Sequence, residues 1–189
     1  MGGVNKRDVL ITAGQKLIWK NGYDRCSVND IAKEAKLPKG SFYHYFESKE
    51  KFALEAMNEF IESHPEQIPS KEIKVETFAK MIEDRINSIV KINFAKECYM
   101  SVMCHSFSEQ EEEFRIEITN AINSSNSSMR NVIESLIQSG QISKKLNTDE
   151  LMEYIDFTWR GARLKARILK SDLPLQLFKK YLINYIFNA

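Results

Sequence analysis

Apolar residues recur at steps of three and four along almost the whole chain, which is the spacing of one face of an α-helix. Val28, Ile31, Ala32 and Ala35 give a clear example. No stretch alternates between apolar and polar residues for more than a few positions. Only 7 glycines and 4 prolines occur among the 189 residues, so the chain has few places to turn. We therefore expect an all-α protein of about nine helices.

The composition narrows the class of protein. Hydrophobic residues make up 43% and charged residues 28% of the chain, the mix of a soluble domain with a real core. Three cysteines are an odd number and too few for a disulfide scaffold, which indicates a reducing compartment. No apolar run approaches the roughly 18 residues of a membrane span, and the charged opening is unlike a signal peptide. We expect a cytoplasmic protein with no membrane partner.

Charge is unevenly distributed along the chain. Nine basic and five acidic residues up to position 49 give this part a net charge of +4 and leave −3 for the rest. A basic N-terminal part favours contact with phosphate. We expect two domains, residues 1–48 and residues 49–189, with a helix at about 48–63 linking them. The sequence His-Pro-Glu-Gln-Ile-Pro-Ser at 64–70 is the clearest linker.

Local signals predict where the first helices begin and end. Asn21-Gly22 is a good helix stop, because both residues tolerate the left-handed conformation. Ser27 is placed to cap a second helix and Ser48 a fourth. Pro38 fits the first turn of a short third helix, where a missing N–H costs nothing. We expect two short helices joined by a tight turn.

Poor helix formers interrupt the C-terminal half at one place. The run Ser-Ser-Asn-Ser-Ser at 124–128 lies inside an otherwise helical apolar pattern that continues to Gly140. We interpret it as the weak middle of one long helix, with a loop as the alternative. Two further helices are expected, from Thr148 to about Lys170 and from Leu173 to about Phe187.

Two short helices joined by a tight turn, the second of which begins with a basic residue, are typical of a helix-turn-helix. The stretch from Gly22 to Glu50 resembles the DNA-binding domain of TetR/AcrR transcriptional regulators. The resemblance covers roughly residues 8–57 and rests on Lys39-Gly40, on Tyr43-His44-Tyr45-Phe46 and on Ser48-Lys49-Glu50. It implies an N-terminal three-helix DNA-binding domain, with the helix that begins near Pro38 lying in the major groove of double-stranded DNA.

Each residue of this motif has a physical reason. Gly40 lets the backbone approach DNA closely, and Lys39 is long enough to reach a guanine edge or a phosphate. The hydroxyls of Tyr43 and Tyr45 can donate to phosphate oxygens, with ordinary half-buried aromatic residues as the alternative. Lys49 lies in the first turn of the fourth helix, where exposed backbone N–H groups favour an anion such as a DNA phosphate. The predicted DNA-binding residues are Ser27, Val28, Asn29, Pro38, Lys39, Gly40, Ser41, Tyr43, His44, Tyr45 and Lys49.

Some residues of the motif have a structural reading, and two depart from the family pattern. Phe42 and Phe46 are four residues apart, so they share a face and are expected to pack on Leu17, Val28 and Ile31. Lys36 stands where glycine is common in the turn, so it must adopt a left-handed conformation or bend the turn differently. Tyr45 replaces the usual histidine.

The resemblance also implies a C-terminal domain that binds a ligand and forms a homodimer. Apolar, aromatic and Met side chains suit an apolar or aromatic inducer, although for each single residue plain core is the favoured interpretation. The expected pocket residues are Phe94, Cys98, Tyr99, Met103, Phe107, Phe114, Met129, Tyr154, Phe157 and Trp159. The expected dimer residues are Gly161, Ala162, Lys165, Leu177, Phe178, Tyr181, Leu182 and Tyr185.

Taken together, these features predict a sequence-specific repressor that a small-molecule inducer releases from a palindromic operator. One alternative is a repressor that senses oxidants or electrophiles through Cys98. The default interpretation of Cys98 is a small buried hydrophobic side chain. Another alternative is an activator of the same fold. We expect no enzyme, because neither Cys98 nor His105 has a paired base, and no cofactor. We expect no metal site, because the three histidines are scattered: His44, His64 and His105.

Overall fold

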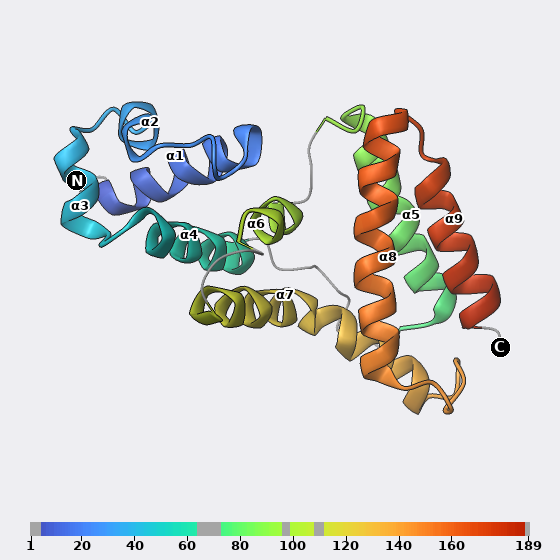
Figure 1. Ribbon diagram of the computed structural model, residues 1–189. Helices are drawn as coiled ribbons and strands as arrows, with labels where there is room; N and C mark the ends of the chain where they lie inside the picture. The colour runs from blue at the N-terminus through green and yellow to red at the C-terminus, as the bar shows by residue number, and fades with distance from the viewer. Residues whose placement is uncertain (1–4, 64–72, 96–98, 108–111, 188–189) are drawn as a thin grey trace. The chain divides into compact units, whose positions relative to one another are not determined.

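The computed structural model describes residues 5–63, 73–95, 99–107 and 112–187, and every regular element in these ranges is helical (Figure 1). This confirms the expected all-α fold. The helices are α1 (Lys6–Asn21), α2 (Val28–Glu34), α3 (Lys39–Tyr45), α4 (Lys49–Ser63), α5 (Val75–Lys91), α6 (Tyr99–Phe107), α7 (Glu112–Gln138), α8 (Thr148–Leu169) and α9 (Leu173–Tyr181). A π-helical segment, Leu182–Ile186, follows α9. None of the described helices is long and apolar enough to cross a membrane.

The chain forms two compact units that are not consecutive in sequence. The first unit comprises residues 1–65 and 99–125, and the second comprises residues 66–98 and 126–189. The first therefore holds α1 to α4, α6 and the first half of α7. The second holds α5, the rest of α7, α8 and α9. Because α7 runs from one unit into the other, it belongs to both.

An aromatic cluster forms the core of the first unit. Phe52 of α4 lies with its ring centroid 5.0 Å from that of Phe42 and 4.8 Å from that of Phe46. All three rings are buried, which confirms the inward face expected for Phe42 and Phe46. On α1 it is Ile18, rather than the expected Leu17, that is fully buried. Apolar side chains at both positions left this choice open to sequence reasoning.

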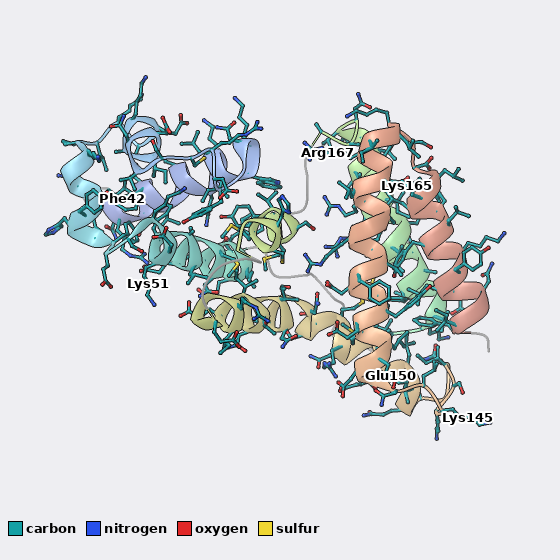
Figure 2. The ribbon with its side chains drawn as sticks, viewed as in Figure 1. Phe42, Lys51, Lys145, Glu150, Lys165 and Arg167 are labelled. Atoms are coloured by element: carbon teal, nitrogen blue, oxygen red, sulfur yellow. The ribbon has the colours of Figure 1, made fainter. Side chains whose placement is uncertain are left out.

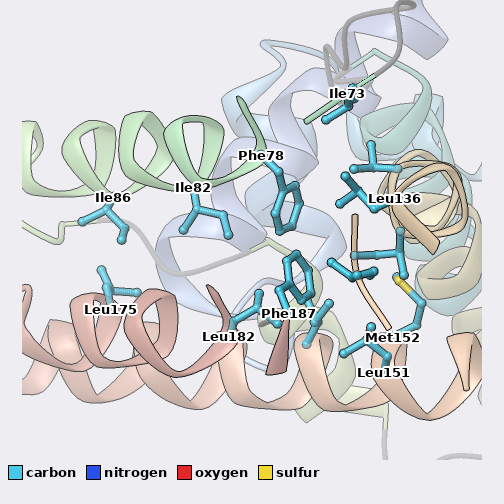
Figure 3. Packing of buried hydrophobic residues seen from close by; sticks show 14 of the residues in the cluster. Ile73, Phe78, Ile82, Ile86, Leu136, Leu151, Met152, Leu175, Leu182 and Phe187 are labelled. Carbon is cyan, nitrogen blue, oxygen red and sulfur yellow. The ribbon is translucent and has the colours of Figure 1, made fainter. Parts of the chain in front are cut away.

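The second unit has a separate hydrophobic core built from α5, α7, α8 and α9 (Figure 3). The rings of Phe78 and Phe187 stack with centroids 5.5 Å apart. Leu175 of α9 lies opposite Ile86 of α5, and Leu182 lies beside Phe187. Burial of these side chains is the main source of stability for such a helical unit.

Several helix limits differ from the sequence-based expectation. Pro38 has an extended ψ of 144° and directly precedes α3, so it is the N-cap and not a residue of the first turn. The final helix changes to π-helical geometry at Leu182. In contrast, α7 passes through the serine run at 124–128 as one helix, so the loop alternative is wrong.

Candidate nucleic-acid interface

The start of α2 is fixed by a capping box. The Ser27 hydroxyl accepts a hydrogen bond from the Asp30 backbone N–H at 3.1 Å, and Asp30 Oδ2 accepts from the Ser27 backbone N–H at 2.9 Å. The Ser27 hydroxyl also donates to this carboxylate at 2.6 Å. These bonds from Ser27 lower the pKa of Asp30. The cap expected at Ser27 is confirmed, and it fixes the end of α2 that is predicted to contact the DNA backbone.

The turn between α2 and α3 contains a left-handed residue, which is the first of the two alternatives stated for Lys36. Lys36 has φ 55°, a conformation that costs a non-glycine residue about 1 kcal/mol. Two hydrogen bonds hold it, from the Lys36 N–H to the Lys33 carbonyl at 3.1 Å and from the Leu37 N–H to the Ala32 carbonyl at 2.9 Å. Lys36 is therefore accommodated in a tight turn that backbone hydrogen bonds close.

Helix α3 divides its side chains between the core and solvent. Phe42 is fully buried and points inward from α3 (Figure 2), whereas Tyr43 is 55% exposed. Lys39, Gly40 and His44 are exposed as well. The remaining predicted contacts on this surface are the exposed Tyr45, Pro38, Ser27 and Asn29 and the half-buried Ser41 and Val28. The structure brings these residues together in the helix-turn-helix.

Gly40 has no role in the fold that would require glycine. A Cβ atom added there meets nothing within 4 Å, and its φ lies outside the positive range. Glycine in a helix destabilises it by roughly 0.5–1 kcal/mol relative to alanine. Neither packing nor backbone conformation among the described residues therefore requires glycine at position 40.

Lys49 is the first residue of α4, and its side chain contacts Tyr23, which precedes α2. Its Nζ lies 3.8 Å from the ring centroid of Tyr23, in the segment between α1 and α2. Ser48 caps α4 as expected, because its hydroxyl accepts from the Lys51 N–H at 3.1 Å. The tyrosine hydroxyl donates to Glu50 Oε1 at 3.0 Å. Sequence reasoning missed Tyr23, and its only signal was an aromatic residue within the motif.

Two basic residues counted in the N-terminal charge are paired inside the first unit. Arg7 Nη1 lies 2.5 Å from Glu59 Oε1 and Arg7 Nη2 lies 2.6 Å from Glu55 Oε2, and both glutamates are on α4. Lys16 Nζ lies 2.5 Å from Glu34. These carboxylates reduce what Arg7 and Lys16 contribute to the basic surface.

The predicted pocket residues are divided between the two units. Tyr99 and Met103 are buried in the first unit, while Phe94 is buried in the second. Met129 and Trp159 are partly buried against the core of the second unit, Tyr154 is half-buried, and Phe157 is 60% exposed on α8. Cys98 lies outside the described residues, as do the side chains of Phe107 and Phe114. Phe157 lies on the outward face of α8, because the inward face holds Ile155 and Ala166, which are about three turns apart and both buried.

The predicted dimer residues are divided between surface and core. Leu182 is fully buried and Phe178 packs on Trp159 with ring centroids 5.2 Å apart, so both serve the core of their own unit. Gly161, Lys165, Leu177 and Tyr181 are exposed and Ala162 is half-buried, while the side chain of Tyr185 is outside the described part. Exposed apolar side chains that the sequence reading did not select are Leu164, Ile168, Leu169 and Leu173.

Comparison with known proteins agrees with this geometry. The profile described as "Bacterial regulatory proteins, tetR family" matches residues 10–56. The profile "Tetracyclin repressor-like, C-terminal domain" matches residues 75–182, more than half of the chain. The first match contains the helix-turn-helix and the second contains α5 to α9.

Two curated relatives align over most of the chain. The HTH-type transcriptional repressor DhaR of Mycobacterium sp. (strain GP1) is 26% identical over 185 residues, covering 97% of this chain and 91% of DhaR. The transcriptional regulator AcuR of Cereibacter sphaeroides is 24% identical over 180 residues, covering 90% of this chain and 80% of AcuR. A crystal structure of reduced NemR from Escherichia coli has the same fold, with a TM-score of 0.79, 20% identity and 96% coverage of both chains. The chain thus belongs to the TetR family of bacterial regulatory proteins and is a DNA-binding transcriptional regulator.

Proposed function

We propose that the protein is a homodimeric repressor that binds a palindromic operator and leaves it when a small apolar or aromatic molecule binds. It acts in the cytoplasm and catalyses no reaction. The observation that carries this proposal is the exposed face of α3 around Gly40, where glycine serves no purpose within the fold. The profile matches at 10–56 and 75–182 support a reading domain at residues 1–48 and a ligand-binding and dimerisation domain at 49–189.

The exposed residues of α3 take different roles at the DNA. Lys39 reads a guanine edge, while Tyr43 and Tyr45 donate to phosphates and set the register of the helix. Ser41 and His44 lie on the same helix and contribute further DNA contacts. Asn29, at the start of α2, contacts the DNA backbone. The Ser27 hydroxyl is already engaged in the capping box, so we assign its contribution to the placement of α2.

The dimer forms through the exposed apolar stripes of α8 and α9. Phe157, Gly161, Leu164 and Ile168 follow one another on α8 at steps of four, three and four residues, and Ile168 is 71% exposed. Leu173 and Leu177 continue the apolar surface on α9. Such faces on a monomer favour an isologous four-helix interface. The half-sites of the operator are then separated by about 34 Å or a multiple of that distance.

The inducer binds among the partly buried side chains of the second unit. Met129 and Trp159 pack on its core, and Tyr154 is half-buried. Flexible Met and flat aromatic side chains adapt to an apolar ligand. Because binding of inducer and operator is linked, DNA must weaken inducer binding by the same factor by which inducer weakens DNA binding.

Selection of bound duplexes from a random DNA pool by the purified protein tests this function. We expect enrichment of a two-fold symmetric site. With that site, Lys39→Ala should weaken binding by about 1–3 kcal/mol and alter the base preference at one position. An equal loss on all sequences would make Lys39 a phosphate contact. Binding without any sequence preference would contradict the proposal.

A change in the α8 surface tests the dimer separately. Ile168→Asp should convert the protein to a monomer in sedimentation velocity and abolish binding to the symmetric site, because each half-site alone binds weakly. Lys145→Ala, at an exposed position between α7 and α8 and outside the predicted dimer residues (Figure 2), is the control. A dimer that persists after Ile168→Asp would move the interface to another surface.

A further inference from the structure

The contact between Lys49 and Tyr23 joins the start of α4 to the segment between α1 and α2. Lys49 Nζ lies 3.8 Å from the centroid of the Tyr23 ring, well within the range of a cation–π interaction. The hydroxyl at the other end of this ring donates to Glu50 Oε1 at 3.0 Å. One tyrosine thus holds both of the first two charged residues of α4.

We propose that Tyr23 is a positioning residue for operator binding, which holds the Lys49 ammonium where it contacts a DNA phosphate. This inference rests on the proposed function, in which Lys49 is one of the phosphate contacts. Tyr23 itself does not touch DNA, because only 4% of it is exposed. Its effect passes through the lysine.

Tyr23 is fixed at both ends, as a positioning residue must be. Its carbonyl accepts a hydrogen bond from the Cys26 N–H at 3.1 Å, and its hydroxyl is bonded to Glu50. The Glu50 carboxylate has a lowered pKa: burial raises it, but bonds from its own backbone N–H, from Ser48 and from Tyr23, together with the Lys49 charge, outweigh that effect. The carboxylate therefore remains ionised at neutral pH and keeps the ring in place.

The ring also separates two opposite charges that are adjacent in sequence. Its hydroxyl binds the Glu50 carboxylate, while its face binds the Lys49 ammonium. An ammonium has three N–H donors, and a ring face occupies only one side of it. Lys49 therefore keeps donors for a phosphate oxygen, while its long side chain loses conformational freedom before DNA arrives, which favours binding.

A double-mutant cycle on DNA affinity tests the coupling between the two residues. The probe is a fluorescein-labelled duplex of mixed sequence, because a phosphate contact does not depend on sequence. Anisotropy titrations over a range of salt concentrations compare the wild type, Lys49→Met, Tyr23→Leu and the double variant. Lys49→Met keeps an apolar stem and removes only the charge.

We expect Lys49→Met to weaken binding and to reduce the slope of log K against log salt by about one unit. Tyr23→Leu should weaken binding about two- to fivefold when Lys49 is present and have no further effect in the Lys49→Met background. Tyr23→Phe keeps the ring face and loses only the bond to Glu50, so its loss should be smaller. It also serves as the test variant if Tyr23→Leu does not fold.

Leu10→Ala is the matched control for general damage to this unit. Leu10 is a fully buried residue of α1, so the variant lowers stability without a direct contact to Lys49. Its effect on DNA affinity should be the same with and without Lys49→Met. Equal losses from Tyr23→Leu in both backgrounds would overturn the inference and leave Lys49 as a phosphate contact. No effect of Lys49→Met on affinity or salt slope would overturn that contact as well, whereas operator selection and Lys39→Ala would still test the reading helix.

Discussion

A Cβ atom on Gly14 of α1 would lie 2.2 Å from Cζ of Phe52 on α4. The Phe52 ring is fully buried between the rings of Phe42 and Phe46, so it has little room to move. Helix α1 therefore approaches the aromatic cluster at a point where any side chain would overlap it. This contact sets the distance between α1 and α4, the helices against which α3 packs.

Gly14→Ala should lower the free energy of unfolding by about 1–3 kcal/mol, the usual cost of overpacking a core. Urea denaturation at a fixed protein concentration measures it. Adding Phe52→Leu should recover part of the loss, because the smaller side chain leaves room for the new methyl group. Stability equal to that of the wild type would show that the ring moves aside freely, and that α1 and α4 are less closely packed than the distance indicates.

Gly40→Ala, unlike Gly14→Ala, should not lower stability but should weaken DNA binding. An added Cβ meets no atom within 4 Å there, so stability should rise by roughly 0.5–1 kcal/mol from better helix propensity. Affinity for the selected operator should fall, since the methyl group holds the α3 backbone away from DNA. Anisotropy with the operator duplex and thermal unfolding give the two readouts. Unchanged affinity would contradict the role proposed for Gly40.

Two buried tyrosines predict opposite effects of the same substitution. Tyr99 stacks on Phe60 with ring centroids 4.4 Å apart, and its buried hydroxyl has no hydrogen-bond partner among the described residues. Burial raises the pKa of this hydroxyl, so it stays protonated and needs an acceptor. A buried polar group without a partner costs about 1–3 kcal/mol. The hydroxyl of Tyr23, in contrast, is bonded to Glu50.

Tyr99→Phe should therefore raise the melting temperature, and Tyr23→Phe should lower it. Differential scanning calorimetry of the two variants at one protein concentration measures both signs. A loss of stability in Tyr99→Phe would indicate that a buried water satisfies this hydroxyl.

The pair of Glu83 and Lys179 predicts a pH dependence in the second unit. Their charged atoms are 2.7 Å apart, joining α5 to α9, and bonds from Lys179 and Gln176 lower the pKa of Glu83. A carboxyl group whose pKa is lower in the folded state stabilises the fold above its unfolded pKa, about 4.3, and this contribution is lost as pH falls through the folded pKa. Both side chains are partly exposed, so at most about 1 kcal/mol is involved.

Glu83→Gln should thus reduce stability at pH 7 and make no difference near pH 2. Urea denaturation across this pH range measures the difference between variant and wild type. Glu76→Gln, at an exposed position of the same helix, is the matched control. A constant difference at all pH values would mean that packing, and not the charge, accounts for the effect of Glu83.

Sequence reasoning succeeded where the determinants are local. The cap at Ser27 follows from the residues next to it. For Lys36 the resemblance left two alternatives, and the structure shows the left-handed one. It was less successful on α8 and α9, because both helices have apolar residues on two faces. Periodicity shows that Leu182 and Ile168 are apolar stripe residues, but not that the first faces its own core and the second faces solvent. The contact of Lys49 with Tyr23 joins segments 26 residues apart and leaves no periodic signal.

The serine run of α7 predicts the weakest part of that helix. Residues 124–128 are helical, yet no side chain between Ala121 and Val132 is fully buried. Ser125 donates its hydroxyl to the Ile122 carbonyl at 2.8 Å, which competes with the helical pattern. The run also contains the boundary between the two compact units, at residues 125 and 126. Packing and propensity are therefore both low at the same place.

Amide hydrogen exchange should be faster at residues 124–128 than at 132–137, where Val132, Ile133 and Leu136 are buried. Ser125→Ala with Ser128→Ala should slow exchange in the run by about fivefold, since each substitution gains roughly 0.5 kcal/mol of helix propensity. Ser88→Ala, at an exposed position of α5, should leave exchange in α7 unchanged. Uniform protection from residue 118 to residue 137 would contradict the prediction, because it would mean that α7 opens as one unit and that the serines do not weaken it locally.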